Sequence, residues 1–399
     1  MPDKDAFSPL PKIPSVTGVR ISGVAAGLKD NGKQDLFVAE LVPGSTIAGT
    51  LTRSRCPGMP VEWNKRQLPG GKVRAIVASS GNSNVFTGGQ GRKLVENTAA
   101  AAAKLIGCRT SQVFLASTGV IGEKKETRFV ADKVPMGVKA LKKTAWHDAA
   151  RSIMTTDRFP KAAARKAKIG NVDVTLVGIA KGSTMIAPDM GTMLSFLFTD
   201  AKIPAKVLQS CLTRAVDRSF NCISVDGDTS TSDTVLLSAT GQVKRQPKIE
   251  RASDPGLKEF RAALEDMTIE LARMIVRDGA ATGNLLTCDV VGAESQRAAR
   301  NIGRAIVDST LVRKGIAGAE PRVGRIVMAV GKAGEKAERD LLGISIGDFV
   351  VAKAGESMPD TEEAGVVSHL KSGQVHLTID IGIGRGLSLI HISEPTRPY

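Results

Sequence analysis

Aromatic residues are scarce in this sequence: one Tyr, two Trp and 11 Phe make up 4% of its 399 residues. The net charge of +15 at pH 7 would suit a nucleic-acid-binding protein. Such a protein also needs aromatic side chains on which bases can stack, and no such platform is visible here. The basic residues are scattered along the chain, so the composition favours a surface that attracts small anionic molecules over one that binds nucleic acid.

Cysteine and long apolar runs are also lacking. The five cysteines lie far apart, are odd in number and form no CxxC pair. This spacing indicates neither a disulfide framework nor a zinc site, and it favours a reducing compartment. No apolar run is long enough to cross a bilayer, and the N-terminal residues contain no apolar signal core. We therefore expect a cytoplasmic protein that uses neither a metal nor a membrane partner.

Hydrophobic residues make up 42% of the chain, and the mean hydropathy is -0.03. A chain of this length can form two domains or one large sandwich with an appendage. Apolar periodicity and Gly or Pro breaks predict a mixture of helices and strands. We expect helices over 93–106, 138–154, 204–220, 257–276 and 293–309. We expect strands within 18–41 and over 45–52, 73–80, 113–116, 172–180, 193–198, 285–291, 323–330 and 345–353.

The stretch 181–201, KGSTMIAPDMGTMLSFLFTDA, contains the Gly191–Thr192 bond that we regard as central. A threonine hydroxyl is a poor nucleophile, but cleavage of the preceding bond gives it an α-amino group as its own base. The pKa of such an amine is about 7.7–8.0, so part of it is neutral at pH 7. Gly191 has no Cβ and allows the twisted backbone that an N-to-O acyl shift needs. Taken alone, a Gly–Thr pair also fits an ordinary turn before a core strand.

The residues around this pair resemble the self-cleavage segment of the ornithine acetyltransferases, also called glutamate N-acetyltransferases, which make arginine precursors. The family usually has Ala where Gly191 stands. Three further blocks follow in the family's order: STGVIGE at 117–123, MTTD at 154–157 and VDGDTSTSDT at 225–234. The resemblance spans about residues 16–386. It implies an α+β fold, an α/β sandwich of helices layered around stacked β-sheets, shared with the related self-cleaving aminopeptidases.

The resemblance also implies roles for individual residues. Thr192 would be the nucleophile, released by autocleavage after Gly191. Thr118 and Gly119, at the end of a predicted strand, would form the oxyanion hole through a hydroxyl and a backbone N–H. Taken alone, these two residues also fit a tight turn between core strands. The substrate-binding residues implied by the family are Thr155, Thr156, Lys181 and Thr192.

Cleavage would divide the chain into an α fragment, residues 1–191, and a β fragment, residues 192–399. The family's assembly implies two copies of each fragment, a heterotetramer. It implies no cofactor, and it allows acetyl-CoA as an additional co-substrate, which the sequence does not decide.

The chain departs from the family at three places. Ala280 stands where the family has a Glu expected to pair with the ammonium group of the substrate. The family motif Asn-Trp-Gly-Arg is replaced by RVGR at 322–325. The family's C-terminal contacts are replaced by residues 387–399, LSLIHISEPTRPY, which resemble a translated sequencing adaptor. We therefore expect residues 387–399 to be a foreign tail.

The leading hypothesis is transfer of acetyl from N2-acetylornithine to L-glutamate through an acetyl-Thr192 intermediate, in arginine biosynthesis. A second hypothesis keeps Thr192 but replaces transfer by hydrolysis, as in a self-cleaved amidohydrolase or aminopeptidase, and the loss of Glu at Ala280 favours it. A third is a basic nucleic-acid-binding protein, which requires strongly salt-dependent binding. A catalytically inactive relative also fits the altered positions.

Overall fold

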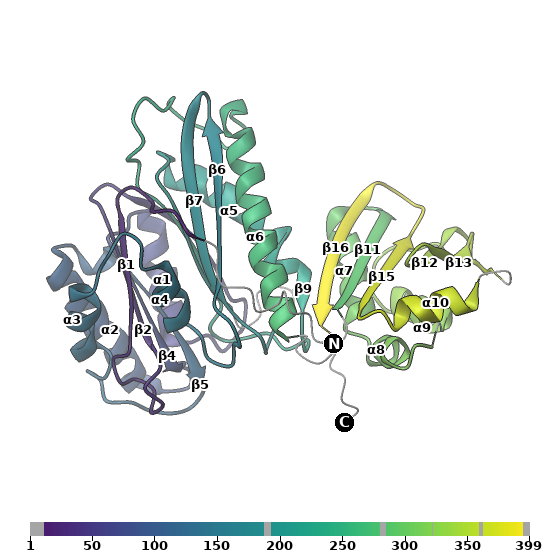
Figure 1. The fold of residues 1–399 in the computed structure, drawn as a ribbon, viewed down its shortest axis with the longest axis horizontal. Coiled ribbons are helices and arrows are strands. Elements are labelled where there is room, and N and C mark those ends of the chain that lie inside the picture. Colours follow the sequence, from purple (N-terminus) through teal and green to yellow (C-terminus); the bar gives the residue numbers. More distant parts are fainter. Residues whose placement is uncertain (1–11, 187–192, 280–284, 321, 359–361, 394–399) are drawn as a thin grey trace.

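The computed structural model describes residues 12–186, 193–279, 285–320, 322–358 and 362–393. Two β-sheets packed face to face form one part of the molecule, and a third sheet with its own helices forms a second lobe (Figure 1). Within the described ranges, no helix is both long and apolar enough to cross a membrane.

The first sheet has four strands, of which β1 and β2 are antiparallel while β4 and β5 run parallel. The second has five, with β8 and β10 parallel at its centre. The order in the first sheet is β1 (Val19–Val24), β2 (Leu36–Leu41), β4 (Ala75–Asn82) and β5 (Val113–Val120). The order in the second sheet is β3 (Thr46–Leu51), β10 (Thr234–Ala239), β8 (Leu194–Thr199), β7 (Val172–Lys181) and β6 (Lys161–Ile169).

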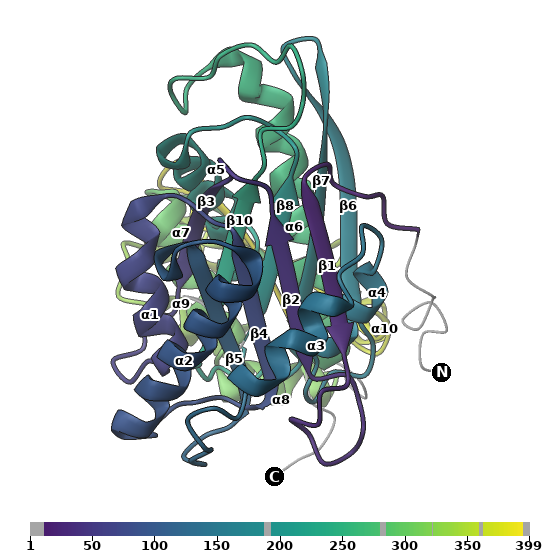
Figure 2. The same cartoon turned by 90° about the vertical axis from the view of Figure 1, so that its left-hand side faces the viewer.

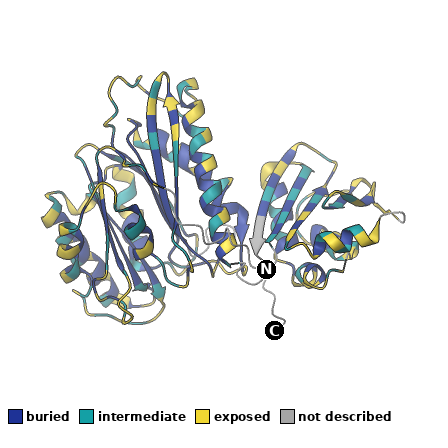
Figure 3. Cartoon of the chain, viewed as in Figure 1, coloured by how far each residue is buried: buried dark blue, intermediate teal, exposed yellow. Residues whose placement is uncertain are grey.

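Alternation of side chains along the strands fills a core on each face of the sheets. On β2, Phe37 points into the layer between the sheets, where it stacks on Phe196 of β8 with ring centroids 4.9 Å apart. The neighbouring Leu36 and Val38 point the other way, toward the helices outside the first sheet. Buried residues accordingly follow the strands through the centre of both sheets (Figure 3).

Helices cover the outer faces, so that the layers are helix, sheet, sheet and helix. Figure 2 looks from the helices onto the first sheet. The core between the first sheet and these helices contains residues of α1 (Met59–Gln67), α2 (Gly88–Ile106) and α3 (Val134–Lys139), while α4 (Trp146–Ser152) packs beside β1. The outer face of the second sheet is covered by α5 (Ala205–Asp217) and α6 (Lys258–Gly279). This arrangement confirms the expected α+β fold of helices layered around stacked sheets.

The second lobe has a seven-stranded sheet whose short strand β9 belongs to the chain segment after α5. The strands in order are β14 (Glu356–Ser357), β13 (Phe349–Lys353), β12 (Gly343–Ile346), β15 (Gln374–Asp380), β11 (Leu285–Ala293), β16 (Gly386–Ser393) and β9 (Ile223–Ser224). Its helices are α7 (Gln296–Val307), α8 (Thr310–Ala317), α9 (Val323–Gly331) and α10 (Glu363–Leu370).

Three predicted elements differ from the structure. The helix expected over 138–154 is two short helices, α3 and α4, because Lys142 between them forms an antiparallel bridge with Ile21. The strand expected over 323–330 is helix α9, whose buried residues Ile326, Ala329 and Val330 have helical spacing. The strand expected over 345–353 is a hairpin of β12 and β13, which turns at Gly347 with φ +60°.

Residues 386–393, which include the start of the expected foreign tail, form strand β16. This strand pairs antiparallel with β11 and parallel with β9, and Ile390 is fully buried. Strand pairing does not reveal the origin of a sequence, so the foreign tail stays a prediction. Residues 394–399 lie outside the described residues.

Candidate functional site

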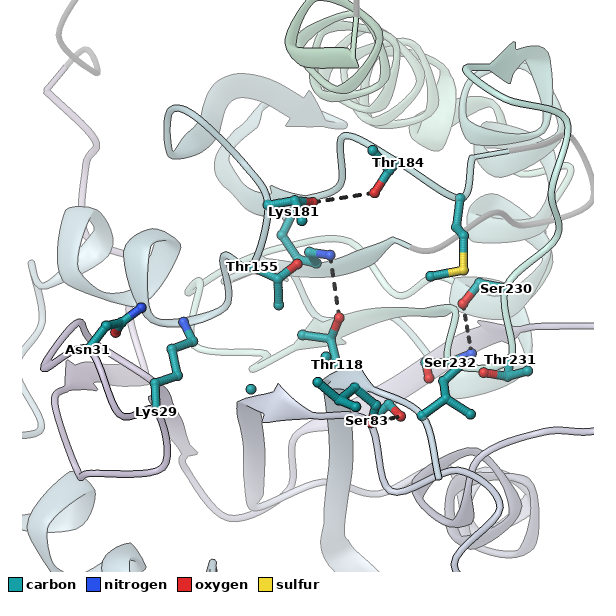
Figure 4. A pocket seen from close by; sticks show the side chains of 16 residues that line it. Lys29, Asn31, Ser83, Thr118, Thr155, Lys181, Thr184, Ser230, Thr231 and Ser232 are labelled. Atoms are coloured by element: carbon teal, nitrogen blue, oxygen red, sulfur yellow. Dashed lines mark hydrogen bonds between the residues drawn. The ribbon is translucent and has the colours of Figure 1, made fainter. Parts of the chain in front are cut away.

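A pocket of about 430 Å³ lies where the ends of β5 and β7 approach each other (Figure 4). Its volume falls within the range of small-molecule sites, about 300–1,000 Å³. The pocket brings together five of the predicted site residues, which come from three separate stretches of sequence: Thr118, Gly119, Thr155, Thr156 and Lys181. The predicted residues Gly191, Thr192 and Ala280 lie outside the described residues.

Thr118 and Gly119 occupy the end of β5, in parallel register with Ser80 and Gly81 of β4. Gly119 has φ +133°, and a Cβ at this position would overlap the carbonyl group of Gly81. Only glycine therefore lets the two backbones come this close. The predicted strand ended at residue 116, but β5 continues through these residues, which rules out an isolated turn.

The hydroxyl of Thr118 is buried and accepts a hydrogen bond from Lys181 Nζ at 3.3 Å. A hydroxyl has two acceptor lone pairs and one donor. Because Lys181 uses one lone pair, the hydroxyl proton remains free to donate to another acceptor. This geometry suits an oxyanion-hole donor.

Lys181 ends β7 and its side chain is 2% exposed. Burial lowers the pKa of this ammonium group, and the nearby charge of Asp157 opposes that effect. The two charged groups are 3.9 Å apart, from Nζ to Oδ2. A cation held inside a pocket in this way can bind the carboxylate of an anionic substrate.

Asp157 supports this part of the pocket, although the sequence analysis gave it no role. Its carboxylate accepts hydrogen bonds from the backbone N–H groups of Thr155, at 3.0 Å, and Gly182, at 2.7 Å. It also accepts one from Lys161 Nζ at 2.7 Å. Burial by itself would raise the pKa of Asp157, but Lys181, Lys161 and these hydrogen bonds outweigh burial and lower it to about 2. Asp157 therefore remains charged and fixes the backbone on both sides of the pocket.

Lys161 is fully buried between Asp157 and Asp278, and its Nζ lies 2.5 Å from Asp278 Oδ2. Asp278 is near the C-terminus of α6, two residues before Ala280. The ion pairs therefore connect the Thr155 loop to the end of α6. The sequence signals for these residues were weak: Lys161 lies in an Ala-rich stretch, Asp157 ends the quoted MTTD motif, and Asp278 lies in no quoted motif.

The two threonines after α4 lie in a loop rather than capping a helix. Thr156 Oγ1 is 2.8 Å from Ser183 Oγ and 3.4 Å from Thr184 Oγ1. These contacts tie the loop to the residues that follow Lys181. Both sides of the pocket near Lys181 therefore carry hydroxyl groups that can bind a substrate.

A second buried carboxyl, Asp233, follows the pocket-lining residues Ser230–Ser232. Its Oδ1 accepts the backbone N–H of Met193 at 3.0 Å, and its Oδ2 has no hydrogen-bond partner among the described residues. Burial raises the pKa of Asp233 well above its ordinary value. Sequence reasoning missed this residue too, because a single Asp in a Ser/Thr-rich loop is common. It fixes the chain one residue beyond Thr192.

In the described ranges, no group of three or more His, Cys, Asp or Glu residues is arranged to hold a metal ion.

Comparison with known proteins gives a consistent picture over the whole length. Residues 20–399 match the sequence profile of the ArgJ family. The arginine biosynthesis bifunctional protein ArgJ of Gluconobacter oxydans is 45% identical over 399 residues, which cover 100% of this chain and 94% of that protein. The protein of the same name from Rhizobium meliloti is 45% identical over 390 residues, covering 97% and 94% of the two chains.

Two solved structures are also similar. The arginine biosynthesis bifunctional protein argJ of Bacillus halodurans is 32% identical with a TM-score of 0.46, over 49% of this chain and 92% of that chain. The ornithine acetyltransferase of Mycobacterium tuberculosis, solved in complex with ornithine, is 29% identical with a TM-score of 0.38, over 43% and 92% of the two chains.

Proposed function

The chain belongs to the ArgJ family and is an acetyltransferase of arginine biosynthesis, and we propose that it transfers acetyl from N2-acetylornithine to L-glutamate. The observation that carries this proposal is the meeting of Thr118, Gly119 and Lys181 in one pocket, with the two threonines of the 155–156 loop beside them. An anion-binding cation and oxyanion donors side by side are what acyl transfer between amino acids requires.

The reaction would proceed in two steps on Thr192, after cleavage of the Gly191–Thr192 bond. The α-amine of Thr192 takes the hydroxyl proton while the oxygen attacks the acetyl carbonyl of N2-acetylornithine. The tetrahedral oxyanion accepts hydrogen bonds from the Thr118 hydroxyl and the Gly119 N–H. The C–N bond then breaks, and the leaving nitrogen of ornithine receives the proton from the Thr192 ammonium.

In the second step, glutamate takes the acetyl group from Thr192 by the same chemistry in reverse order. Its neutral amine attacks the acetyl ester on Thr192, the same donors stabilise the second oxyanion, and the Thr192 oxygen leaves and recovers a proton. N-acetylglutamate is released and the free enzyme is regenerated. Lys181 holds a substrate carboxylate in both steps, and Thr155 and Thr156 position the acyl donor.

The proposal includes the assembly and the donors. We propose that fragments 1–191 and 192–399 stay associated, with two copies of each, in the cytoplasm. The reaction needs no cofactor. We propose acetyl-CoA as an additional donor for glutamate, which would give the enzyme a second activity; the relatives are named bifunctional.

Hydrolysis remains the second candidate because Ala280 lacks the carboxylate that the family resemblance places beside the substrate ammonium. Without good acceptor binding, water would compete for the acetyl-enzyme. Product analysis with N2-acetylornithine separates the two functions. Transfer yields N-acetylglutamate when glutamate is present, whereas hydrolysis yields acetate whether glutamate is present or not.

The nucleophile is tested by fragment analysis. Denaturing gels of freshly purified protein should show two fragments, and the second should begin Thr-Met-Leu-Ser. The Thr192→Ala variant should stay one chain and form no acetyl-enzyme by intact mass. A single full-length band from folded wild-type protein would contradict the self-cleavage mechanism.

A further inference from the structure

Lys29 is a second cation that lines the pocket, and the proposed reaction does not use it. It lies in the loop between β1 and β2, is half-buried and lines the pocket together with Asn31. In Figure 4, Lys29 lies at one end of the pocket and Ser230 at the other, with Lys181 and Thr118 between them. The pocket therefore carries two positive charges at separate places.

The loop that carries Lys29 is held in position by a buried carboxylate. Asp35 is fully buried and accepts hydrogen bonds from the backbone N–H groups of Ala26, Leu28 and Lys29 at 2.7, 2.6 and 3.0 Å. Several hydrogen bonds to one buried carboxylate fix the backbone of a loop that would otherwise be free to move. The position of Lys29 at the pocket is thus built into the fold.

In the part of the chain that the structure describes, the hydrogen-bond partners of the Lys29 ammonium are neutral. Its Nζ donates to the carbonyl oxygens of Met154, at 2.7 Å, and Gln34, at 3.1 Å. Among the described residues, no carboxylate forms an ion pair with it. An ammonium group has three N–H donors, so one donor remains for a ligand. Burial lowers the pKa of Lys29, and an anionic ligand would offset that effect.

The described lining of the pocket contains Lys29 and Lys181 but no Asp or Glu. A site with two separate cations and no carboxylate is complementary to a molecule with two carboxylates. We infer that Lys29 binds the side-chain carboxylate of the acceptor amino acid, while Lys181 binds its α-carboxylate. The site thus selects a dicarboxylic acceptor, an inference that rests on the proposed acetyl transfer to glutamate.

The positive charge of Lys29 should weaken the binding of the donor, N2-acetylornithine. The donor and the acceptor use one nucleophile in turn, so their side chains occupy the same volume at different times. The side chain of N2-acetylornithine carries an ammonium, which Lys29 repels. Specificity here comes from repulsion of one substrate as well as from attraction of the other.

The wild-type protein provides the first test. Glutamine has nearly the shape of glutamate but no side-chain charge. With preformed acetyl-enzyme, kcat/KM should be about ten- to a hundredfold higher for glutamate than for glutamine, the effect of one charge-assisted hydrogen bond. Equal values for the two acceptors would overturn the inference.

The second test compares three variants. Lys29→Gln should raise KM for glutamate about ten- to a hundredfold, remove the preference over glutamine, and leave KM for N2-acetylornithine unchanged or lower. Lys29→Arg should keep most of the preference because it keeps the charge. Lys33→Gln removes an exposed lysine of the same loop that does not line the pocket, and it should behave as wild type.

A purely structural role for Lys29 predicts a different result. If Lys29→Gln weakens the binding of glutamate, glutamine and N2-acetylornithine alike, the side chain only shapes the loop and the inference is wrong. Calorimetric binding of glutamate and glutamine to the wild-type protein needs no turnover. It tests the Lys29 contact even if no acetyl-Thr192 forms, an outcome that would count against the proposed function instead.

Discussion

Replacing Asp157 by Asn should destabilise the protein and change the pH dependence of its activity at the same time. The substitution keeps the size of the side chain but removes a charge that lies between two buried lysines. In the described part of the chain, Lys161 would keep Asp278 alone as a charged partner. Among the described residues, Lys181 would keep no carboxylate within ion-pair distance.

The environment of Asp157 in the structure sets the expected loss of stability. Interactions in the folded protein lower the pKa of Asp157 from an ordinary 3.8 to about 2, which corresponds to about 2 kcal/mol of stability. Removing one partner from a buried ion pair typically costs about 3–5 kcal/mol. We therefore expect a loss of about 3 kcal/mol, a large part of a typical total of about 5–15 kcal/mol.

The sign of the pH effect follows from the lowered pKa. In the wild-type protein the contribution of Asp157 is fully present above about pH 4 and is lost as the pH falls toward 2. Stability of Asp157→Asn should lack this acid-dependent loss. The catalytic activity of Asp157→Asn should differ from that of the wild-type protein at high pH. Without Asp157 the pKa of Lys181 falls further, so kcat/KM should decline at a lower pH than in wild type.

Urea unfolding at pH 7 and pH profiles of kcat/KM measure these two effects. Asp132→Asn is a matched control, because Asp132 forms an exposed pair with Arg128 and such pairs contribute about 1 kcal/mol or less. A loss below about 1 kcal/mol in Asp157→Asn, together with an unchanged pH profile, would refute the role assigned to this carboxylate.

Other positions give further tests. Thr118→Ala should lower kcat about 10²–10³-fold with little change in KM; a rise in KM alone, in steady-state assays, would place Thr118 in substrate binding. Gly119→Ala should abolish activity and lower the melting temperature, because its Cβ would overlap the backbone of the neighbouring strand. Asp233→Asn should unfold in urea much like wild type, whereas Asp233→Ala should lose about 1–3 kcal/mol because the Met193 N–H loses its partner. Ala280→Glu should raise kcat/KM for N2-acetylornithine about ten- to a hundredfold by adding a charged partner for its ammonium; no gain would mean that this position does not contact the donor.

The site was predictable from sequence where functional residues sit at the ends of apolar strands. Thr118 and Lys181 each follow such a run, and the structure places both at one pocket. The resemblance supplied their roles, because strand ends alone do not tell a turn from an oxyanion hole. The roles of Thr118, Lys181, Thr192 and Ala280 all stay predictions.

The buried charges were not predictable. Lys161 and Asp278 are 117 residues apart, and only the packing of α6 against β6 brings them together. Strand β6 itself was missed, because its sequence KAAARKAKI has the composition of a helix. Its pairing with β7 along nine residue pairs overrides that local preference.

The order of strands in the second sheet has a consequence for how the cleaved protein could assemble. Strands β8 and β10, which follow Thr192 in the chain, lie between β7 on one side and β3 on the other, which precede it. Two polypeptides would thus be interdigitated within one sheet, and neither could complete its core alone. Refolding of the denatured, cleaved protein would be bimolecular, with a rate that depends on protein concentration. Refolding of uncut Thr192→Ala would be unimolecular, because the covalent link supplies the high effective concentration that two separate fragments lack.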